Sequence, residues 1–345
     1  MLPRERIQAA LAYRAPDVLP VRIYPGDGGL FEHGRPLARL VETCGHDFGD
    51  LGRVDLPDPP RPDDFDADGQ YHAYRLDEWG TNWEYRIFGV WGHPCAWPLD
   101  DLADLGDYLP PPAPVAEGPD VDAERDRAAE HRARHYLLGP GGSLFEKMHA
   151  LRRFEDVLMD VALDTPQINR IADMIMDHVR AQVARSLAVG ADGIAFGDDF
   201  GTQSAMIMAP ETWRRFFRPR YDELFAPIRA AGRDIFFHCC GRVGPILPDL
   251  RDLGVSAIWP QLTAYDLPEL ARICRDLGLA VELHPDRGDL MQSAPPDAVR
   301  AYLERLFELF DTPGGGSWLY IEIDPGFAFA NVEALFETAM RLRAG

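Results

Sequence analysis

The chain has 345 residues, of which 46% are hydrophobic, and this is enough to build one large domain or two ordinary ones. Its 35 basic and 56 acidic residues give a net charge of -21, which argues against binding to nucleic acid and gives no attraction to an anionic membrane. No apolar run approaches the roughly 20 residues of a membrane-spanning helix. The five cysteines, an odd number in a long chain, favour a reducing, cytoplasmic setting over a disulfide framework.

The first third of the chain is irregular. A strand at 19–24 (LPVRIY) ends in Tyr24, which we predict to contact substrate. The aromatic stretch 71–99 is typical of a hairpin or small sheet, and 109–120 is a proline-rich connector. We expect 40–135 to be an insertion that caps the fold, within a single domain spanning 1–345.

From residue 135 onward, apolar strand-like runs alternate with helical patterns. Several helices end in glycine directly before the next strand, which is the expected C-cap and short connection. Such alternation predicts a parallel α/β sheet, and its length favours a TIM-type (β/α)8 barrel, with the eighth strand expected between 40 and 135. The predicted strands are 19–24, 135–140, 192–199, 234–240, 256–261, 279–284 and 318–324.

The stretch 234–240 (DIFFHCC) carries a histidine and two cysteines at the end of a strand. Active sites of such barrels gather at the carboxyl ends of the strands. Because side chains alternate across a strand, His238 and Cys240 share one face, and Cys239 points toward the helices. Imidazole and thiolate are preferred zinc ligands, so this H-x-C arrangement indicates a metal site. The alternative is two core residues beside a turn.

A catalytic zinc site needs a third protein ligand and an open position. Glu322 and Asp324 share a face of the strand at 318–324, and Glu282 and His284 share a face of the strand at 279–284. Any of these side chains could complete the site.

Two adjacent acids, Asp198 and Asp199, follow another strand in the stretch 197–203 (GDDFGTQ). Neighbouring acids in one cleft push one pKa upward, which suits acid–base work. Alternation cannot place both inward, so we expect one to face the pocket and the other to cap a helix or pair with an arginine. We assign Asp198 and Gln203 to catalysis and Asp199 to substrate binding, with a structural turn as the alternative.

The stretch 284–288 (HPDRG) ends the strand at 279–284. We assign His284 to catalysis, and Arg287 and Glu282 to substrate binding. A simple salt bridge within the turn is the alternative.

Several stretches together resemble the uroporphyrinogen decarboxylase superfamily. They are RERIQAALAYRAPDVLPV, GPGGSLFEKMHALRRFEDVLMD, GADGIAFGDDFGTQSAMIMAPETWRRFFRPRYDELF, FFHCCGRVGPILPDLRDLGVSAIWPQ and NVEALFETAMRLR. The resemblance implies a TIM-type barrel with its cleft at the strand carboxyl ends. It also implies one of two activities: cofactor-free decarboxylation of porphyrinogen acetate groups, or zinc-dependent methyl transfer involving corrinoids and thiols.

The resemblance favours the methyltransferase branch. The paired arginines of the decarboxylases are missing after the first strand, whereas His238 and Cys240 match the H-x-C of the methyltransferases. The later cysteine of that branch is absent, and Glu322 or Asp324 stands in its stretch, so we expect Glu322 as the third zinc ligand. The resemblance implies a small-molecule substrate and a methylated corrinoid, free or on a partner protein, or a small methylated compound as donor.

Two other hypotheses remain open from the sequence. One is a metal-free decarboxylase in which Arg287, Arg152 and Arg153 bind the substrate carboxylate. The other is a catalytically inactive barrel that binds a small molecule or a partner protein. The acidic surface and the aromatic stretch 71–99 are also compatible with a homodimer.

Overall fold

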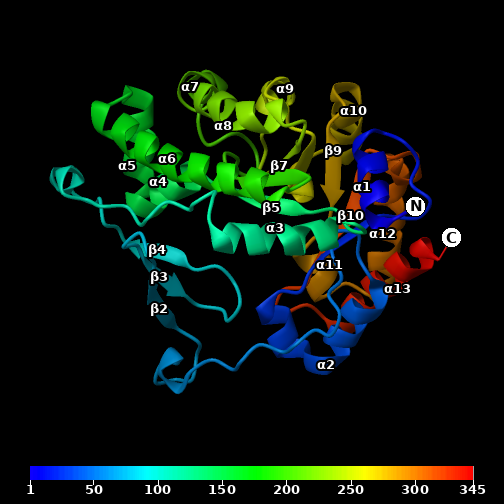
Figure 1. The fold of residues 1–345 in the computed structure, drawn as a ribbon. Helices are drawn as coiled ribbons and strands as arrows, with labels where there is room; N and C mark the ends of the chain where they lie inside the picture. The colour runs from blue at the N-terminus through cyan, green and yellow to red at the C-terminus, as the bar shows by residue number, and fades with distance from the viewer. Residues whose placement is uncertain (345) are drawn as a thin grey trace.

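A curled parallel sheet with helices on its outside forms the main body of the computed structural model, which describes residues 1–344 (Figure 1). Within these residues the sheet has seven strands in the order β1-β10-β9-β8-β7-β6-β5, all parallel. The strands are β1 (Val21–Tyr24), β5 (Leu138–Gly142), β6 (Gly193–Gly197), β7 (Asp234–Cys239), β8 (Ala257–Pro260), β9 (Ala280–Leu283) and β10 (Ser317–Glu322). This confirms an α/β fold with a TIM-type parallel sheet.

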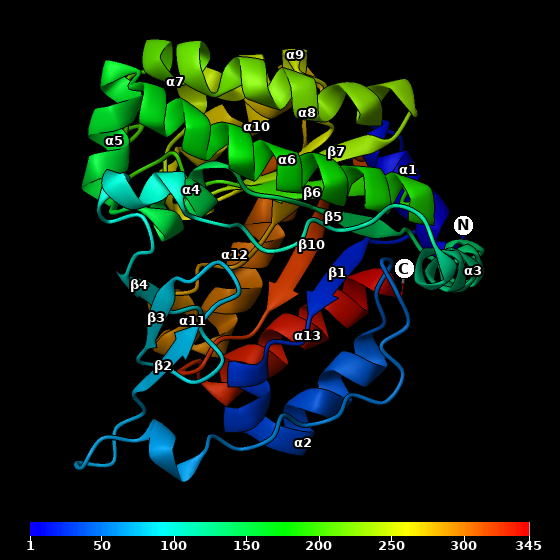
Figure 2. The same ribbon diagram turned by 60° about the vertical axis from the view of Figure 1, so that its left-hand side comes forward.

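The helices cover the outer face of the curled sheet, and α6 and α8 lie side by side above it (Figure 2). Within residues 1–344, no helix combines the length and apolar composition needed to cross a bilayer. The helices are α1 (Pro3–Leu11), α2 (Asp27–Cys44), α3 (Pro119–Arg132), α4 (Phe145–Leu151), α5 (Phe154–Leu163), α6 (Pro166–Val189), α7 (Pro210–Phe216), α8 (Arg218–Ala230), α9 (Leu247–Asp252), α10 (Leu267–Leu277), α11 (Asp289–Gln292), α12 (Pro296–Leu309) and α13 (Phe329–Arg343).

Two faces of the sheet bury two different cores. The outward side chains of β7, among them Phe237 and Cys239, belong to the large core between strands and helices. The inward side chains at the start of the strands form a smaller cluster, and α1 covers it at the amino-terminal ends of the strands. That cluster comprises Ile7, Ala10, Tyr136, Phe236, Ala257, Ala280 and Trp318. Alternation along β7 therefore directs His238, two residues after Phe236, toward the inside of the curl.

Glycines end α6 and α10 as the sequence predicts. Gly190 and Gly278 have φ angles of 94° and 67°, in the left-handed region that favours glycine, and each is followed by a strand within three residues. These turns let each helix fold back onto the sheet, and so they bring the strand carboxyl ends to one edge.

The eighth strand that we expected between 40 and 135 is not part of the sheet in the described residues. The single residue Asp47 lies between the two edge strands instead: its N–H donates to Val21 O at 2.8 Å and its C=O accepts from Tyr136 N at 3.1 Å. The Asp47 carboxylate is fully buried and binds Arg6 and Arg343 from the two terminal helices. Asp47 therefore bridges the beginning of β1 and the residues just before β5, which are the two edges of the sheet.

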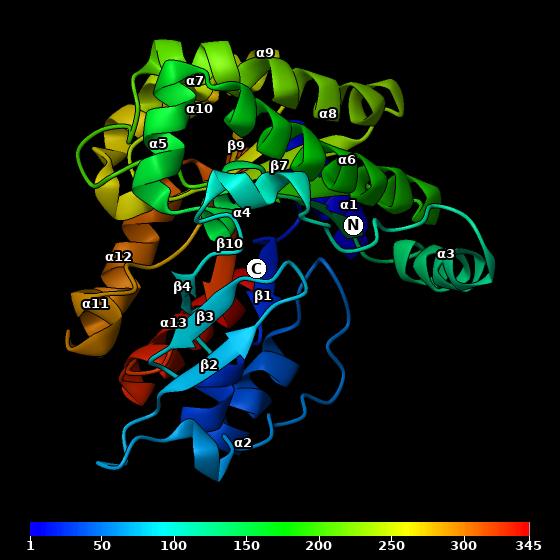
Figure 3. The same ribbon diagram turned by 90° about the vertical axis from the view of Figure 1, so that its left-hand side faces the viewer.

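A separate antiparallel sheet forms in the aromatic stretch, as predicted. It consists of β2 (Ala73–Leu76), β3 (Asn82–Tyr85) and β4 (His93–Ala96), with β3 in the middle. Figure 3 shows this small sheet in front of β1 and β10, next to α4. Its position matters because two of its tryptophans reach the cavity described below.

Candidate active site

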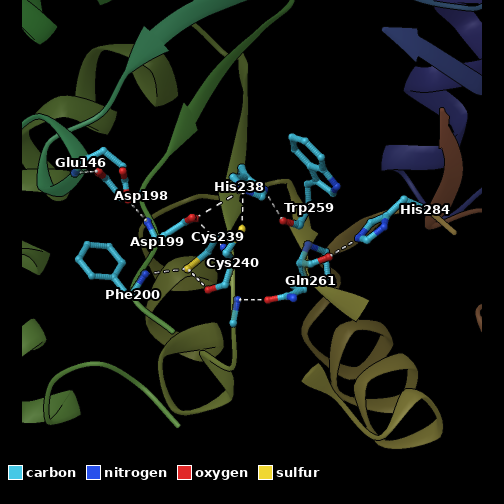
Figure 4. A network of polar contacts seen from close by, with 12 residues as sticks. Glu146, Asp198, Asp199, Phe200, His238, Cys239, Cys240, Trp259, Gln261 and His284 are labelled. Atoms are coloured by element: carbon cyan, nitrogen blue, oxygen red, sulfur yellow. Dashed lines mark hydrogen bonds and ion pairs between the residues drawn. The ribbon is translucent and has the colours of Figure 1, made fainter. Parts of the chain in front are cut away.

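Three potential metal ligands meet at the carboxyl ends of β6 and β7 (Figure 4). Asp199, His238 and Cys240 each offer a ligand atom, and these atoms lie within 4.8 Å of one another. His238 Nε2 is 3.4 Å from Cys240 Sγ and 3.5 Å from Asp199 Oδ1. Within residues 1–344, this is the one group of three such side chains that meets this distance.

The backbone of β8 orients the His238 ring. His238 Nδ1 lies 2.9 Å from Trp259 O, and the ring packs on the Trp259 indole with centroids 4.1 Å apart. Because a carbonyl oxygen can only accept, neutral His238 carries its proton on Nδ1 and directs the Nε2 lone pair toward Cys240 and Asp199. A carbonyl partner on the second nitrogen is the usual arrangement of a metal-binding histidine.

The two adjacent cysteines have different environments. Burial and the nearby Asp199 carboxylate raise the pKa of the Cys240 thiol to about 12, so without a cation it stays protonated. Cys239 points the other way, where its sulfur accepts from Phe200 N at 3.2 Å inside the large core. Only Cys240 is therefore placed to bind a ligand.

The loops that carry Asp199 and Cys240 touch through their backbones. A Cβ added to Gly241, whose φ is 70°, would lie 2.1 Å from the carbonyl carbon of Gly201. The Cys240 N–H also donates to Asp199 Oδ1 at 2.6 Å. The two loops therefore hold their side chains at a fixed separation.

Asp198 has a structural environment. It is fully buried, and its carboxylate accepts from Leu144 N and Glu146 N at the start of α4 and from the hydroxyl of Tyr221 in α8. Burial raises the pKa of Asp198 to about 7, although the three hydrogen bonds oppose this shift. Of the two adjacent acids, the structure turns Asp199 toward the cluster and Asp198 toward the α4 backbone.

Glu322, predicted as the third ligand, lies apart from the cluster. Its carboxylate accepts from Arg287 Nη1 at 3.0 Å and from the Tyr320 hydroxyl at 3.2 Å. Asp324 binds the same arginine through Nε and Nη2. Arg287, predicted to bind substrate, is therefore paired with two carboxylates, and the geometry favours Asp199 over Glu322 and Asp324 as the third ligand.

Gln203 and Glu282 lie in two different environments. Gln203 Nε2 donates to Gln261 Oε1, which also accepts from Gly241 N. Glu282 is buried and binds Arg22 and the Trp318 indole. The structure thus places Gln203 in the loop network beside the cluster and Glu282 in an internal ion pair.

His284 and Tyr24 differ strongly in exposure. His284 is buried, and its ring nitrogens lie 2.9 Å from Pro285 O and 3.0 Å from Pro260 O, so both nitrogens face carbonyl groups. Burial lowers the pKa of His284. Tyr24 is 55% exposed at the end of β1 and does not line the cavity described below.

A cavity of about 560 Å³ opens over the cluster, a volume that suits a small molecule. Its wall combines residues of the main sheet, of α4 and of the small sheet. It is lined by Trp83, Trp91, Gly92, His93, Ser143, Glu146, Lys147, Ala150, Gly197, Asp199 and His238.

The sequence analysis missed several wall residues, including Glu146, Lys147 and the two tryptophans. Glu146 follows the glycine stretch 139–142 at the start of α4, and its position just after a strand end was the available signal. Burial raises the pKa of Glu146, but its contact with His149 outweighs this, so the pKa is lowered overall. Glu146 is therefore an ionised group on the cavity wall at neutral pH.

Residues 128–341 match the family model of uroporphyrinogen decarboxylase (URO-D), and this is more than half of the chain. The chain belongs to the URO-D family. The URO-D match includes β5 to β10, and therefore all three members of the cluster. The tryptophans of the small sheet lie before it, so the cavity wall combines matched and unmatched parts of the chain.

One solved structure agrees with this URO-D family member in fold over its whole length. A methyltransferase from Methanosarcina mazei aligns over 99% of each chain with a TM-score of 0.62 and 14% identity, which shows a shared fold. A dihydropteroate synthase from Xanthomonas albilineans covers 57% of this chain and 65% of its own, at 15% identity and a TM-score of 0.36, which is too low for any inference. No curated sequence in the comparison matches the chain.

Proposed function

We propose that this URO-D family member is a zinc-dependent methyltransferase that moves a methyl group from a methylated donor to a thiol. The observation that supports this function is the convergence of Asp199, His238 and Cys240, of which Asp199 and His238 line a cavity of about 560 Å³. In the reaction, a thiolate attacks the methyl carbon. The new S–C bond uses the thiolate electron pair, and the donor keeps the electrons of the bond that breaks.

The donor set fits zinc. One imidazole nitrogen, one thiolate sulfur and one carboxylate oxygen leave a fourth position open, as in catalytic zinc sites. With bonds of about 2.0 to 2.3 Å and tetrahedral angles, the ligand atoms of a zinc site lie about 3.3 to 3.6 Å apart. The separations of 3.4 Å between Cys240 and His238 and 3.5 Å between His238 and Asp199 fall in that range.

Zinc held by these three residues would lower the pKa of a bound thiol and so supply the thiolate at neutral pH. The chain itself provides a place for the released proton. Glu146 lines the cavity, and its Oε2 is 3.1 Å from His149 Nε2. We assign this pair as the proton acceptor, because an ionised carboxylate backed by an imidazole can take up a proton and pass it outward.

The charges near the cavity disfavour the metal-free decarboxylase. That reaction needs free cations for the substrate carboxylate, but Arg287 is paired with Glu322 and Asp324. Arg152 binds Asp160, and Arg153 binds Asp100. None of the three arginines lines the cavity.

The donor is a methylated corrinoid, free or on a partner protein, or a small methylated compound. The cavity has the volume of a small-molecule site. A corrinoid donor would therefore present its methyl group from outside the mouth, whereas a small donor would enter the cavity.

The test is the zinc content of the purified protein together with its activity. We expect about one zinc per chain, and loss of zinc and of thiol methylation in His238→Ala and Cys240→Ala. Cys239→Ala is the matched control, because this neighbouring sulfur faces the large core and should leave zinc content unchanged. Zinc below about a tenth of an equivalent in wild type, unchanged in His238→Ala, would contradict the proposal, as would activity that survives a chelator.

A further inference from the structure

Two tryptophans from the small sheet stand at the edge of the cavity. Trp83 on β3 and Trp91 just before β4 have ring centroids 6.2 Å apart and planes tilted by 58°; we call them the tryptophan pair. Both line the cavity together with Asp199 and His238, and Trp91 is 83% exposed. Large exposed aromatic side chains beside a cavity favour ligand binding over a purely structural role.

Acidic groups lie beside the tryptophan pair, and the arginine that lines an adjacent hollow with it, Arg75, is paired with Asp64. Glu146 and Asp199 line the same cavity, and Trp83 Nε1 donates to Asp77 Oδ2 at 3.1 Å. This hydrogen bond lies in the plane of the indole, so it does not occupy the electron-rich face of the ring. Aromatic faces and carboxylates both attract a positive charge.

The wall of the cavity offers one cation, and that cation is already neutralised. Lys147 Nζ lies 3.8 Å from Asp77 Oδ2 and 5.0 Å from the centroid of the Trp79 ring. No arginine and no other lysine of residues 1–344 lines the cavity. Even with a divalent ion held by the Asp199 carboxylate and the Cys240 thiolate, the ion and its ligands sum to zero charge, and Glu146 leaves the cavity negative.

This balance selects against anionic ligands. A thiol or donor with a sulfonate or carboxylate group would enter a negative cavity and find no free cation to pair with, and an unpaired charge in such a site is costly. A ligand with a compact positive head is instead attracted by the carboxylates and the aromatic faces. Lys147 against Trp79 and Asp77 is an internal example of the same recognition.

We propose that the cavity binds a small organic cation, a methylated ammonium or sulfonium compound, with its charged head on the tryptophan pair and facing Glu146. Its role as methyl donor rests on the proposed function, whereas its binding does not. In the transfer, the bond between the methyl carbon and the onium nitrogen or sulfur breaks, and its electron pair stays on that atom, which becomes neutral. The thiolate pair forms the new S–C bond.

The test is calorimetric binding of choline to the zinc-loaded protein, compared with 3,3-dimethylbutan-1-ol, a neutral molecule of the same shape, and with 3,3-dimethylbutanoate, an anion. We expect choline to bind about tenfold more tightly than the neutral molecule, and the anion not to bind chelator-treated protein, in which no zinc can hold its carboxylate. Trp83→Leu, Trp91→Leu and Glu146→Gln should each remove most of this preference. Tyr74→Leu is the control, because Tyr74 is a half-exposed aromatic residue of the same small sheet that does not line the cavity.

Equal affinity for choline and the neutral molecule would overturn the proposal, as would preference for the anion or unchanged choline binding in both tryptophan variants. The two proposals fail separately. Selective choline binding by a protein that holds no zinc supports the cation site and contradicts zinc-dependent methyl transfer. Methylation of a thiol by a methylated corrinoid, without choline binding, supports methyl transfer and contradicts the cation site.

Discussion

The carboxylates of the adjacent residues Asp198 and Asp199 point to opposite sides of the chain (Figure 4). Asp198 accepts from two backbone N–H groups at the start of α4, and Asp199 lies 3.5 Å from His238 Nε2. One acid therefore supports the fold, and the other belongs to the candidate zinc site. This division allows the two functions to be separated by neighbouring substitutions.

We expect Asp198→Asn to lower the free energy of unfolding by about 2 kcal/mol, because the new amide brings a donor against buried donors. Asp199→Asn should change stability by less than about 1 kcal/mol but weaken zinc binding at least about tenfold. Urea unfolding and metal titration of both variants check this. Loss of zinc in Asp198→Asn with unchanged stability would contradict the assignment.

Zinc content also decides between Asp199 and Glu322 as the third ligand. We expect Glu322→Gln to keep its zinc, since this carboxylate is held by Arg287 and Tyr320, while Asp199→Asn loses it. Metal analysis of the two variants, purified side by side, is the measurement. The opposite pattern would show that Glu322 leaves Arg287 and moves to the metal.

The glycine contact between the two ligand loops predicts a specific sensitivity. Gly241→Ala should lower the free energy of unfolding by about 2 kcal/mol more than Gly232→Ala and should weaken zinc binding as well. Both glycines have positive φ, but a Cβ at Gly232 has open space, whereas one at Gly241 meets the Gly201 backbone. Equal losses of stability in the two variants, measured by urea unfolding, would show that the loops can separate freely.

His46 should make the protein less stable in acid. Burial lowers the pKa of His46 to about 4, against about 6.5 in an unfolded chain. Below pH 6.5 the unfolded state therefore binds the proton more tightly than the folded state, so stability is lost as the pH falls from 6.5 toward 4. In residues 1–344 neither ring nitrogen has a hydrogen-bond partner, which agrees with a neutral ring.

The corresponding variant is His46→Leu. Between pH 7 and pH 5 we expect it to lose about 1 kcal/mol less unfolding free energy than wild type, because partial exposure of the ring reduces the roughly 2 kcal/mol that the full pKa shift would give. Chemical denaturation at the two pH values measures the difference. Parallel loss in both proteins would assign the acid sensitivity to other groups.

Most of the sheet and the orientation of the H-x-C pair follow from local sequence. The seven parallel strands lie where apolar runs predict them, and alternation places Cys239 outward and His238 inward because the pleat fixes both faces. Alternation does not extend past the strand end, so it could not decide which of Asp198 and Asp199 faces the pocket. That choice depends on where α4 begins, a contact between residues far apart in the chain.

Two other features depend on long-range paths of the chain. The expected eighth strand is replaced by one residue, Asp47, whose place between β1 and β5 leaves no periodic pattern to detect. The tryptophan pair belongs to an aromatic stretch that predicts a small sheet, but nothing local indicates that this sheet lies next to α4. The sequence therefore indicated the meeting of His238 and Cys240 better than the third member of the cluster or the walls of the cavity.

The hydrogen bond between Tyr136 N and Asp47 O has a consequence for how this molecule can diversify. The chain leaves the sheet after Asp47 and returns beside it at Tyr136, so the segment 48–135 begins and ends at the same place. Within this segment Val54, Trp79, Leu99 and Leu105 pack into the large core, so changes of length that keep the strand register are confined to its exposed turns. Because the same segment carries Trp83 and Trp91, a change in its turns would alter the cavity wall while the strands that hold Asp199, His238 and Cys240 stay in place.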